Sequence, residues 1–340
     1  MRKNNSATLD DVAKLAKVSR ATVSRVINTP EKVSPEICER TLAAIAKLRY
    51  TPNFSARALT TGTPLTIGLV FFEDIRTLFA NPFWGEILNP VYENLAKRNL
   101  SCNLIAHGSF AKNENIDELY GQFIAQGRAD GYIFFGRYPE EIEKRFGLAH
   151  LPIVIFGKPY SNNSEFSFVD TDNITGASSA VAYLASRGRK RIATITGPVD
   201  GGAGFDRFLG YKNGLVEVGM KFDPSLVAYG EWTRESGIEA MKKLLKDNKD
   251  IDGIFIASDL MAVGALEVLA DHKIKVPKDI AIVANDNSEL AVMSSPTLTS
   301  VKQPCEEIGS ELVVAVLKAI EGVSHQARIL GTEIIERESA

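Results

Sequence analysis

Two carboxylates stand where strand-like apolar runs end, a pattern that could bind a polyol. Asp259 follows the run 251–257, and Asp286 follows the run 280–284. A carboxylate can accept paired hydrogen bonds from vicinal hydroxyls, while an aromatic ring can cover the apolar face of a sugar. Phe83 and Trp84 are adjacent at the start of a helical stretch, so we expect one of the two rings to be free to stack on a ligand. Together these residues predict a sugar-type binding site.

Each of these residues also has a purely structural interpretation. Asp259 could cap the helix that follows it, which would leave its neighbour Ser258 nearer the ligand. Phe83 and Trp84 could simply belong to the core. For Asp286 the ligand-binding interpretation is stronger, and we expect ligand hydroxyls rather than a core partner to complete its hydrogen bonds.

The N-terminal segment differs in charge from the rest of the chain. Residues 1–60 contain eleven Lys or Arg and five Asp or Glu, a net charge of +6. The other 280 residues contain twenty-eight and thirty-seven, a net charge of −9, and the two parts sum to −3. A basic head on an acidic body is typical of polyanion binding, although a solvated surface would have the same composition.

Helix-start signals divide this basic segment into three short helices. Thr8-Leu9-Asp10-Asp11 places a hydroxyl at the N-cap and a carboxylate three residues later, which predicts a capping box. Ser19 can cap a second helix over 20–27 after a tight connection at Lys17-Val18, and Ser34-Pro35-Glu36 opens a third. Two short helices joined by a tight turn and supported by a third form a helix-turn-helix unit.

The same residues resemble the headpiece of transcription regulators of the LacI/GalR family. The resemblance runs through Thr8-Leu9-Asp10-Asp11-Val12-Ala13, Val18-Ser19, Thr22-Val23-Ser24-Arg25-Val26-Ile27-Asn28 and Tyr50-Thr51-Pro52-Asn53. It is far more specific than a helix-turn-helix pattern alone. It implies that operator double-stranded DNA is a partner and that the second helix lies in the major groove.

The resemblance also implies which side chains contact DNA. Arg20 and Ala21 stand at the two base-reading positions, where Arg20 could donate to a guanine edge and Ala21 could contact a thymine methyl. Arg25 matches a family arginine that reaches DNA, although it could be only a solvated charge, and Ser19 could be only a cap. Short polar side chains suited to phosphate oxygens complete the set. They are Thr8, Ser19, Thr22, Ser24 and Asn28.

A short segment at 53–60 matches the hinge helix of the family. Asn53 can cap it, but a helix this short is marginal in isolation. In the family, two such helices meet at the operator dyad, where a leucine at the position of Leu59 wedges into the minor groove. The resemblance places Ala56 at the close approach and Arg57 at a phosphate. An ordinary linker is the alternative interpretation.

The remainder of the chain, 61–340, alternates apolar strand-like runs with amphipathic helical stretches, which predicts an α/β fold with parallel sheets covered on both faces. There are too many strands for one domain of average size, so two lobes are expected. The predicted strands are 65–72, 102–106, 130–135, 153–156, 191–196, 251–257 and 280–284. The predicted helices are 83–98, 116–126, 176–186, 205–218, 235–246 and 260–271.

This body resembles the effector-binding core of the same family, which is similar to periplasmic sugar-binding proteins. Val169-Asp170-Thr171-Asp172-Asn173 and Pro296-Thr297-Leu298-Thr299-Ser300-Val301 are among the segments that carry the resemblance. It implies a head at 1–60 and an effector-binding core at 61–340. In that core, one lobe comprises about 62–156 and 302–322, and the other about 157–295 and 323–340. It also implies a ligand cleft between the lobes.

The resemblance adds residues to the predicted ligand site. Arg207 matches a pocket arginine, and the pair Asp206-Arg207 is common among sugar-responsive members. Trp232 falls where the family keeps an aromatic residue over the ligand, and Phe83 or Trp84 matches a further pocket aromatic. Asp206 could instead only orient Arg207, and Trp232 could only close a loop.

Several function classes lack their sequence signals. The chain has no run of eighteen apolar residues and no signal-peptide pattern, so a cytoplasmic protein without a membrane partner is expected. Three scattered cysteines and four histidines without metal-ligand spacing predict reduced thiols and no metal. Neither a P-loop, a dinucleotide fingerprint nor a nucleophile elbow is found. These absences alone do not exclude an α/β enzyme, which is a further alternative, but the family resemblance implies no enzyme and no cofactor.

The leading interpretation is therefore a homodimeric repressor that a sugar or oligosaccharide releases from its operator. The stretch Phe79-Ala80-Asn81-Pro82-Phe83-Trp84, together with Asp206-Arg207, resembles maltose- and oligosaccharide-responsive members. A regulator of the same family that uses its ligand as a co-repressor is one alternative. A solute-binding protein for sugar transport is another, but it would require export and would not need the basic head.

Overall fold

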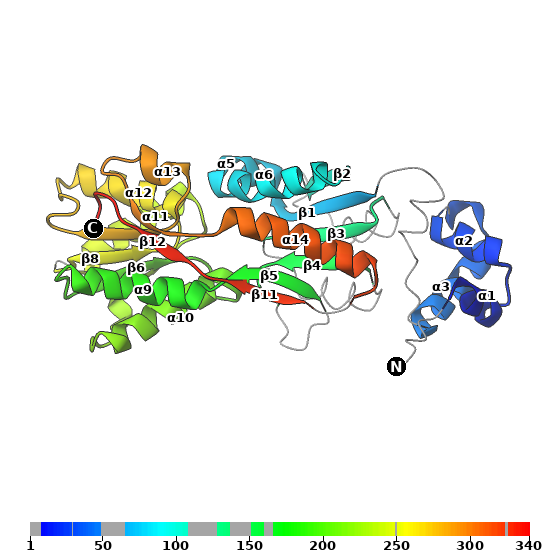
Figure 1. The fold of residues 1–340 in the computed structure, drawn as a ribbon. Helices are drawn as coiled ribbons and strands as arrows, with labels where there is room; N and C mark the ends of the chain where they lie inside the picture. Colours follow the sequence, from blue (N-terminus) through cyan, green and yellow to red (C-terminus); the bar gives the residue numbers. More distant parts are fainter. Residues whose placement is uncertain are drawn as a thin grey trace. The chain divides into compact units, whose positions relative to one another are not determined.

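The chain divides into two compact units, each made of several segments (Figure 1). The computed structural model describes residues 8–28, 30–48, 65–107, 128–136, 151–159, 166–248, 250–323 and 326–340. The first unit comprises Met1–Arg76, Tyr92–Phe168 and Glu311–Ala327, and the second comprises Thr77–Val91, Val169–Ser310 and Arg328–Ala340. Within the described ranges, no helix has both the length and the apolar character needed to cross a bilayer.

The N-terminal head is a bundle of three short helices around a small core. The predicted capping box is confirmed, because the Thr8 hydroxyl accepts from the Asp11 N–H while the Asp11 carboxylate accepts from the Thr8 N–H at 2.8 Å. Val12, Val23 and Ala44 bring one buried side chain from each helix into that core. The elements are α1 (Leu9–Ala16), α2 (Arg20–Asn28), η1 (Pro30–Lys32) and α3 (Pro35–Leu48).

A six-stranded sheet forms the first α/β layer, in the order β11-β5-β4-β3-β1-β2. Its centre is parallel, and all five residues of β3 are buried, as expected for a strand covered on both faces. The predicted strands at 65–72, 102–106, 130–135 and 153–156 are confirmed. The strands are β1 (Thr66–Asp74), β2 (Ser101–His107), β3 (Gly131–Phe135), β4 (Ile153–Phe156), β5 (Ser167–Thr171) and β11 (Ala327–Leu330).

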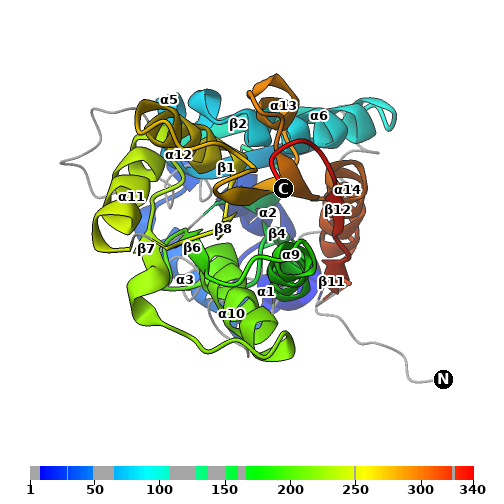
Figure 2. The same ribbon diagram turned by 90° about the vertical axis from the view of Figure 1, so that its left-hand side faces the viewer.

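The second sheet has the order β12-β10-β9-β8-β6-β7, with only β12 paired antiparallel among the pairings described. Its side chains alternate between two cores. Ile254 and Ile256 pack with α11 and α12, whereas Phe255 packs on the other face with α9 and α10. Figure 2 shows the two pairs of helices on opposite sides of this sheet. The strands are β6 (Ile192–Thr196), β7 (Val227–Tyr229), β8 (Gly253–Ile256), β9 (Ala281–Asp286), β10 (Thr299–Lys302) and β12 (Glu333–Ile335).

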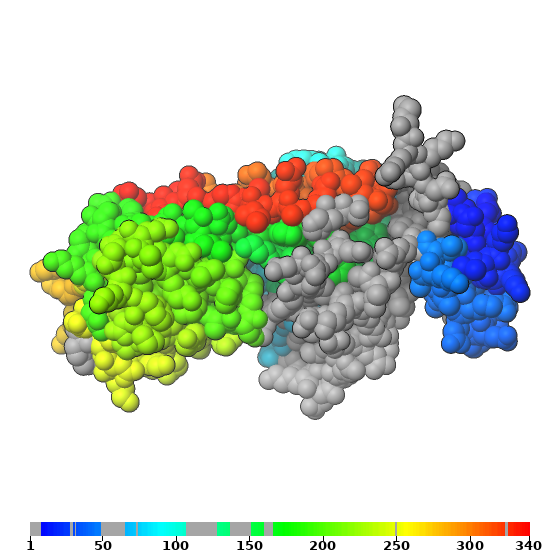
Figure 3. All heavy atoms as spheres, turned by 90° about the horizontal axis from the view of Figure 1, so that it is seen from below, coloured from blue at the N-terminus to red at the C-terminus, as the bar shows by residue number. Residues whose placement is uncertain are grey.

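Helices α9 and α10 approach closely beneath this sheet. A Cβ atom added to Gly210 would lie 2.2 Å from the carbonyl oxygen of Ile174, so only glycine fits there. The opposite side of α10 faces solvent, and Val216 there is 74% exposed. In Figure 3 the segment around α10 is part of the yellow-green surface. The remaining helices are α5 (Ile75–Ala80), α6 (Pro82–Ala96), α9 (Asn173–Ser186), α10 (Gly202–Glu217), η3 (Pro224–Leu226), α11 (Arg234–Asp247), α12 (Asp259–Asp271), α13 (Glu289–Met293) and α14 (Cys305–Ile320).

The boundaries between the units differ from the expected lobe boundaries. The first sheet continues past Phe156, because β5 adds a strand beside β4, and the chain enters the second unit within β5, at Val169. Residues 77–91, expected in the first lobe, group with the second unit. There the Glu86 carboxylate accepts from the Glu289 N–H at 3.0 Å, and Pro90 packs against Gly309.

Candidate ligand site and nucleic-acid interface

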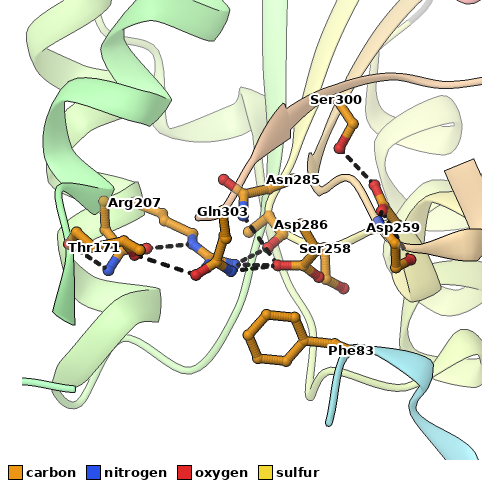
Figure 4. Close-up of polar contacts among 12 residues, drawn as sticks. Phe83, Thr171, Arg207, Ser258, Asp259, Asn285, Asp286, Ser300 and Gln303 are labelled. Carbon is orange, nitrogen blue, oxygen red and sulfur yellow. Dashed lines mark hydrogen bonds and ion pairs between the residues drawn. The ribbon is translucent and has the colours of Figure 1, made fainter. Parts of the chain in front are cut away.

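Arg207, on α10, is the centre of a buried polar network in the second unit (Figure 4). Its Nε donates to Asn173 Oδ1 at 2.8 Å, and its Nη1 donates to the Ala257 carbonyl and lies 3.5 Å from Asp286 Oδ1. Only 4% of the residue is exposed. Burial lowers the pKa of Arg207, while the negative charge of Asp286 opposes that shift most strongly. An arginine remains charged in proteins, so the site holds one buried cation.

Asp286 ends β9 and accepts three hydrogen bonds through a single oxygen, Oδ1. Besides the Arg207 contact, it accepts from Gln303 Nε2 at 2.8 Å and from Asn285 Nδ2 at 3.0 Å. Burial raises the pKa of Asp286, and the Arg207 charge is the largest opposing influence. The expectation that ligand hydroxyls alone complete its hydrogen bonds is therefore wrong, because protein donors already surround Oδ1. A ligand must join or replace bonds of an existing network.

Two members of this network, Asn173 and Gln303, were not predicted. Asn173 begins α9 and donates through Nδ2 to Asp170 Oδ1 at 3.2 Å. Gln303 follows β10, and its Oε1 accepts from the Thr171 hydroxyl at 3.2 Å. Both residues come within two positions of the end of a short strand, β5 or β10, and the apolar runs did not predict either strand. The polar ends of β5 and β10 were the signal that could have found them, since such ends gather at one edge of a parallel sheet.

Trp232 stacks against the arginine at the centre of the network. The Arg207 Cζ lies 5.5 Å from the ring centroid, which is within the range of a cation–π contact. Trp232 has a φ of +61°, and its ring lies so close to Gly197 that a Cβ atom there would be 2.2 Å from the indole. The structure thus places Trp232 beside Arg207, and its contact with a ligand remains a prediction.

The two adjacent aromatic residues at the start of α6 are both buried. Phe83 is 9% exposed and Trp84 is 8% exposed, with their ring centroids 5.4 Å apart in a tilted arrangement. The premise that two adjacent rings at a helix start cannot both point inward is wrong, since both are buried here. The contact of either ring with a ligand stays a prediction. Figure 4 shows Phe83 projecting from α6 toward the side of the network formed by Asp286 and Gln303.

Ser258, and not Asp259, caps α12, which differs from the interpretation that made Asp259 the cap. Ser258 caps α12, because its hydroxyl accepts from the Met261 N–H at 3.2 Å. The Asp259 carboxylate is fully buried, and it accepts from the Ser288 N–H, the Ser288 hydroxyl and the Ser300 hydroxyl at 2.6, 2.9 and 2.7 Å. Burial, helped by the charge of Asp286, raises the pKa of Asp259 to about 7.

Asp206, the partner predicted for Arg207, is buried beside it on α10 at 9% exposure. Among the bonds described above, Asn173 orients the guanidinium by accepting from its Nε. Whether Asp206 contacts a ligand stays a prediction.

In the head, helix α2 has one buried side and one exposed side, and the residues predicted to contact DNA must lie on the exposed side. Val23 and Val26 are buried, whereas Arg20, Ala21 and Arg25 are exposed and Ser24 is half-buried.

Ser19 acts as the predicted cap of α2, since its hydroxyl accepts from the Thr22 N–H at 3.0 Å. Arg20 is 3.7 Å from the Asp10 carboxylate, with both side chains largely exposed, so this ion pair can exchange for a contact with DNA. The side chain of Asn28 and the hinge residues Asn53, Ala56, Arg57 and Leu59 lie outside the described residues.

Two family models match separate parts of the chain. "Bacterial regulatory proteins, lacI family" matches residues 8–53, and "Periplasmic binding protein-like domain" matches residues 181–340. The chain is 38% identical to the HTH-type transcriptional regulator CelR of Thermobifida fusca, with all of both chains covered. It is 32% identical to the HTH-type transcriptional repressor CytR of Escherichia coli (strain K12), over 99% of this chain and 97% of the relative.

A solved structure described as a transcriptional regulator CelR–cellobiose complex resembles the whole chain. It superimposes with a TM-score of 0.77 at 36% identity, covering 98% of this chain and all of that chain. The likeness therefore includes both the part that carries the helix-turn-helix and the part that carries the buried network.

Proposed function

The chain belongs to the LacI family of bacterial regulatory proteins, and from this premise we propose that it is a transcriptional repressor released from its operator by a cellobiose-like sugar. It acts as a homodimer in the cytoplasm and catalyses no reaction. The relatives are transcriptional regulators, and one of them was solved with cellobiose bound.

The observation that carries the choice of a sugar is the buried Arg207–Asp286 network with aromatic rings beside it. A pyranose presents hydroxyls around an apolar face, so it needs charged donors and acceptors together with an aromatic surface. Arg207 and Asp286 would bond the hydroxyls, and Trp232 and Phe83 would cover the ring faces. Neighbouring residues that would shape the site are Trp84, Asp206, Ser258 and Asp259.

The head would supply the DNA contacts. With α2 in the major groove, its exposed N-terminal residues Arg20 and Ala21 would face base edges. Arg25 and the short polar side chains around it would contact the phosphates. Thr8, Ser19, Thr22, Ser24 and Asn28 form that polar set. Asn53, Ala56, Arg57 and Leu59 would form the hinge at the operator dyad.

The test measures operator binding across sugar titrations. A duplex is first selected from random DNA by the full chain, and its affinity is followed by fluorescence anisotropy with cellobiose or with maltose. These sugars contain the same glucose units, but their linkages differ in configuration. We expect cellobiose to weaken operator binding and maltose to have less effect. If maltose is the stronger, the resemblance to maltose-responsive members identifies the effector.

Asp286→Ala should bind the same duplex but respond only at much higher sugar, because a lost charged acceptor costs about 1.5–3 kcal/mol per bond. Stronger operator binding in the presence of sugar would show a co-repressor instead. No response of the wild type to either disaccharide would contradict the proposed effector class, and a response of Asp286→Ala at the wild-type midpoint would remove that residue from the site.

A further inference from the structure

The turn that carries Asp286 has an unusual backbone. Asp286 and the next residue, Asn287, have φ angles of +118° and +58°, and neither is a glycine. Non-glycine residues rarely adopt positive φ, and two in succession persist only when the surrounding structure holds them. The direction of the Asp286 side chain therefore depends on what holds residues 286–288.

The Asp259 carboxylate accepts the hydrogen bonds that hold this turn. Its Oδ2 accepts from the Ser288 N–H at 2.6 Å and from the Ser288 hydroxyl at 2.9 Å. Its Oδ1 accepts from the Ser300 hydroxyl at 2.7 Å, and that hydroxyl oxygen in turn accepts from the Asn287 N–H at 3.0 Å. The backbone amides of Asn287 and Ser288 are thus both linked to the Asp259 carboxylate. The Ser288 amide donates to it directly, and the Asn287 amide is linked through the Ser300 hydroxyl.

The same contacts argue against a direct contact between Asp259 and a ligand. The residue is 0% exposed, and both of its oxygens already accept from protein donors. Ser288 and Ser300, which supply those donors, are also buried. A carboxylate enclosed in this way can orient its neighbours but has no surface to offer a sugar.

We propose that Asp259 is a positioning residue, which holds the turn at 286–288 so that the Asp286 carboxylate meets Arg207 and the ligand. The proposal rests on the proposed function for the identity of the ligand but not for the role of the turn. Asn287 has a second attachment, since its Oδ1 accepts from Arg337 Nη2 at 2.6 Å. Loss of Asp259 should therefore loosen the turn without unfolding the unit.

The first measurement is cellobiose affinity by calorimetry on the full chain. Asp259→Asn keeps the shape of the side chain but cannot accept at all three positions, so we expect affinity to fall about tenfold, as for one lost charged hydrogen bond. Asp223→Asn is the matched control. Asp223 also accepts from a serine N–H and hydroxyl, those of Ser225 at 2.9 and 2.7 Å, but it lies outside the network.

A double-mutant cycle separates positioning from contact. In the Asp286→Ala background, measured at millimolar cellobiose, Asp259→Asn should change affinity by less than about twofold, because the carboxylate it positions is gone. If the fold-losses in cellobiose affinity of the two single variants multiply in the double variant, Asp259 acts on the sugar itself, and the proposal is overturned. Ser300→Ala, which removes the hydroxyl between the Asn287 amide and Asp259 Oδ1 and leaves both Ser288 bonds in place, serves if Asp259→Asn fails to fold.

Amide hydrogen exchange provides a readout that needs no ligand. The Asn287 and Ser288 amides should exchange faster in Asp259→Asn than in the wild type, while Asp223→Asn leaves them unchanged. Unchanged exchange at both amides would overturn the proposal even if cellobiose affinity falls. If the wild type does not bind cellobiose, the proposed effector fails, and the exchange result still decides the role of Asp259.

Discussion

Asp259 and Asp286 are two buried carboxylates that share one buried cation, Arg207. Asp286 contacts the guanidinium, whereas the Asp259 carboxylate accepts only from serine donors in the contacts described and influences Arg207 through its charge. The backbone N–H of Asp259 bonds to Asp286. Burial raises the pKa of both acids, and for Asp259 it does so to about 7. The site therefore contains more carboxylates than cations, and neutral hydrogen-bond donors together with Arg207 stabilise those carboxylates.

The raised pKa of Asp259 makes stability depend on pH with a defined sign. The unfolded chain releases this proton near pH 3.8 and the folded chain near pH 7, so the folded state binds more protons between these values. The contribution of Asp259 to stability therefore falls as pH rises from about 4 to about 7. Relative to wild type, Asp259→Asn should be least stable at pH 5 and should recover toward pH 8. Urea denaturation at both pH values measures the difference.

The charged groups that act on Asp259 are Asp286, which raises its pKa, and the nearby cation Arg207. Asp223→Asn again provides the control, because hydrogen bonds from Ser225 lower the pKa of Asp223. The stability of that variant should differ from wild type in its pH dependence only at acidic pH, where Asp223 itself titrates. A constant difference between Asp259→Asn and wild type from pH 5 to pH 8 would contradict the assignment of this titration to Asp259.

Among the elements, those with local signals were predictable and those fixed by distant partners were not. The cap at Thr8 and the apolar runs of β1 and β8 lie within a few residues of sequence. Strand β10 contains the buried residue Thr299, whose N–H donates to the Ser339 hydroxyl at 2.8 Å. A buried polar strand satisfied by a residue forty positions away resembles a loop when it is viewed locally.

This difference also limited the prediction of the site. Arg207, Asp286 and Trp232 were identified and lie together, but Asn173 and Gln303 follow the unrecognised strands β5 and β10. Ser258 and Asp259 presented a different difficulty. Either could cap α12, and the choice depends on Ser288 and Ser300, which reach Asp259 only in the folded chain.

Helix α2 supports a prediction about base recognition. Arg20→Ala should relax the preference for one base in each half-site and weaken binding by about 1–3 kcal/mol, because a bidentate contact with guanine is lost. Selection from random duplexes by wild type and variant measures this change. Arg25→Ala is the comparison, since a phosphate contact affects all sequences alike. An unchanged preferred sequence in Arg20→Ala would show that another residue reads that base.

Across the whole molecule, charge and core are divided between the head and the rest. Among the described residues, the buried side chains of the head core come from α1, α2 and α3, and residues 1–60 carry a net charge of +6 against −9 for the remainder. A protein that begins at residue 62 should therefore fold, bind cellobiose with wild-type affinity and lose operator binding. Calorimetry measures the cellobiose affinity of the shortened protein, and fluorescence anisotropy measures its operator binding. Specific operator binding by the shortened protein would contradict a head that carries the DNA contacts.

The interleaved segments of the two units bear on how the protein is made. Glu311–Ala327 belongs to the first unit but is translated after Val169–Ser310 of the second, and β11 is the edge strand of the first sheet. On the ribosome, the head can fold as soon as α3 emerges, whereas both sheets must wait for the last part of the chain. A premature stop codon before residue 311 would thus leave each sheet without one edge strand, β11 or β12, and still release a folded head.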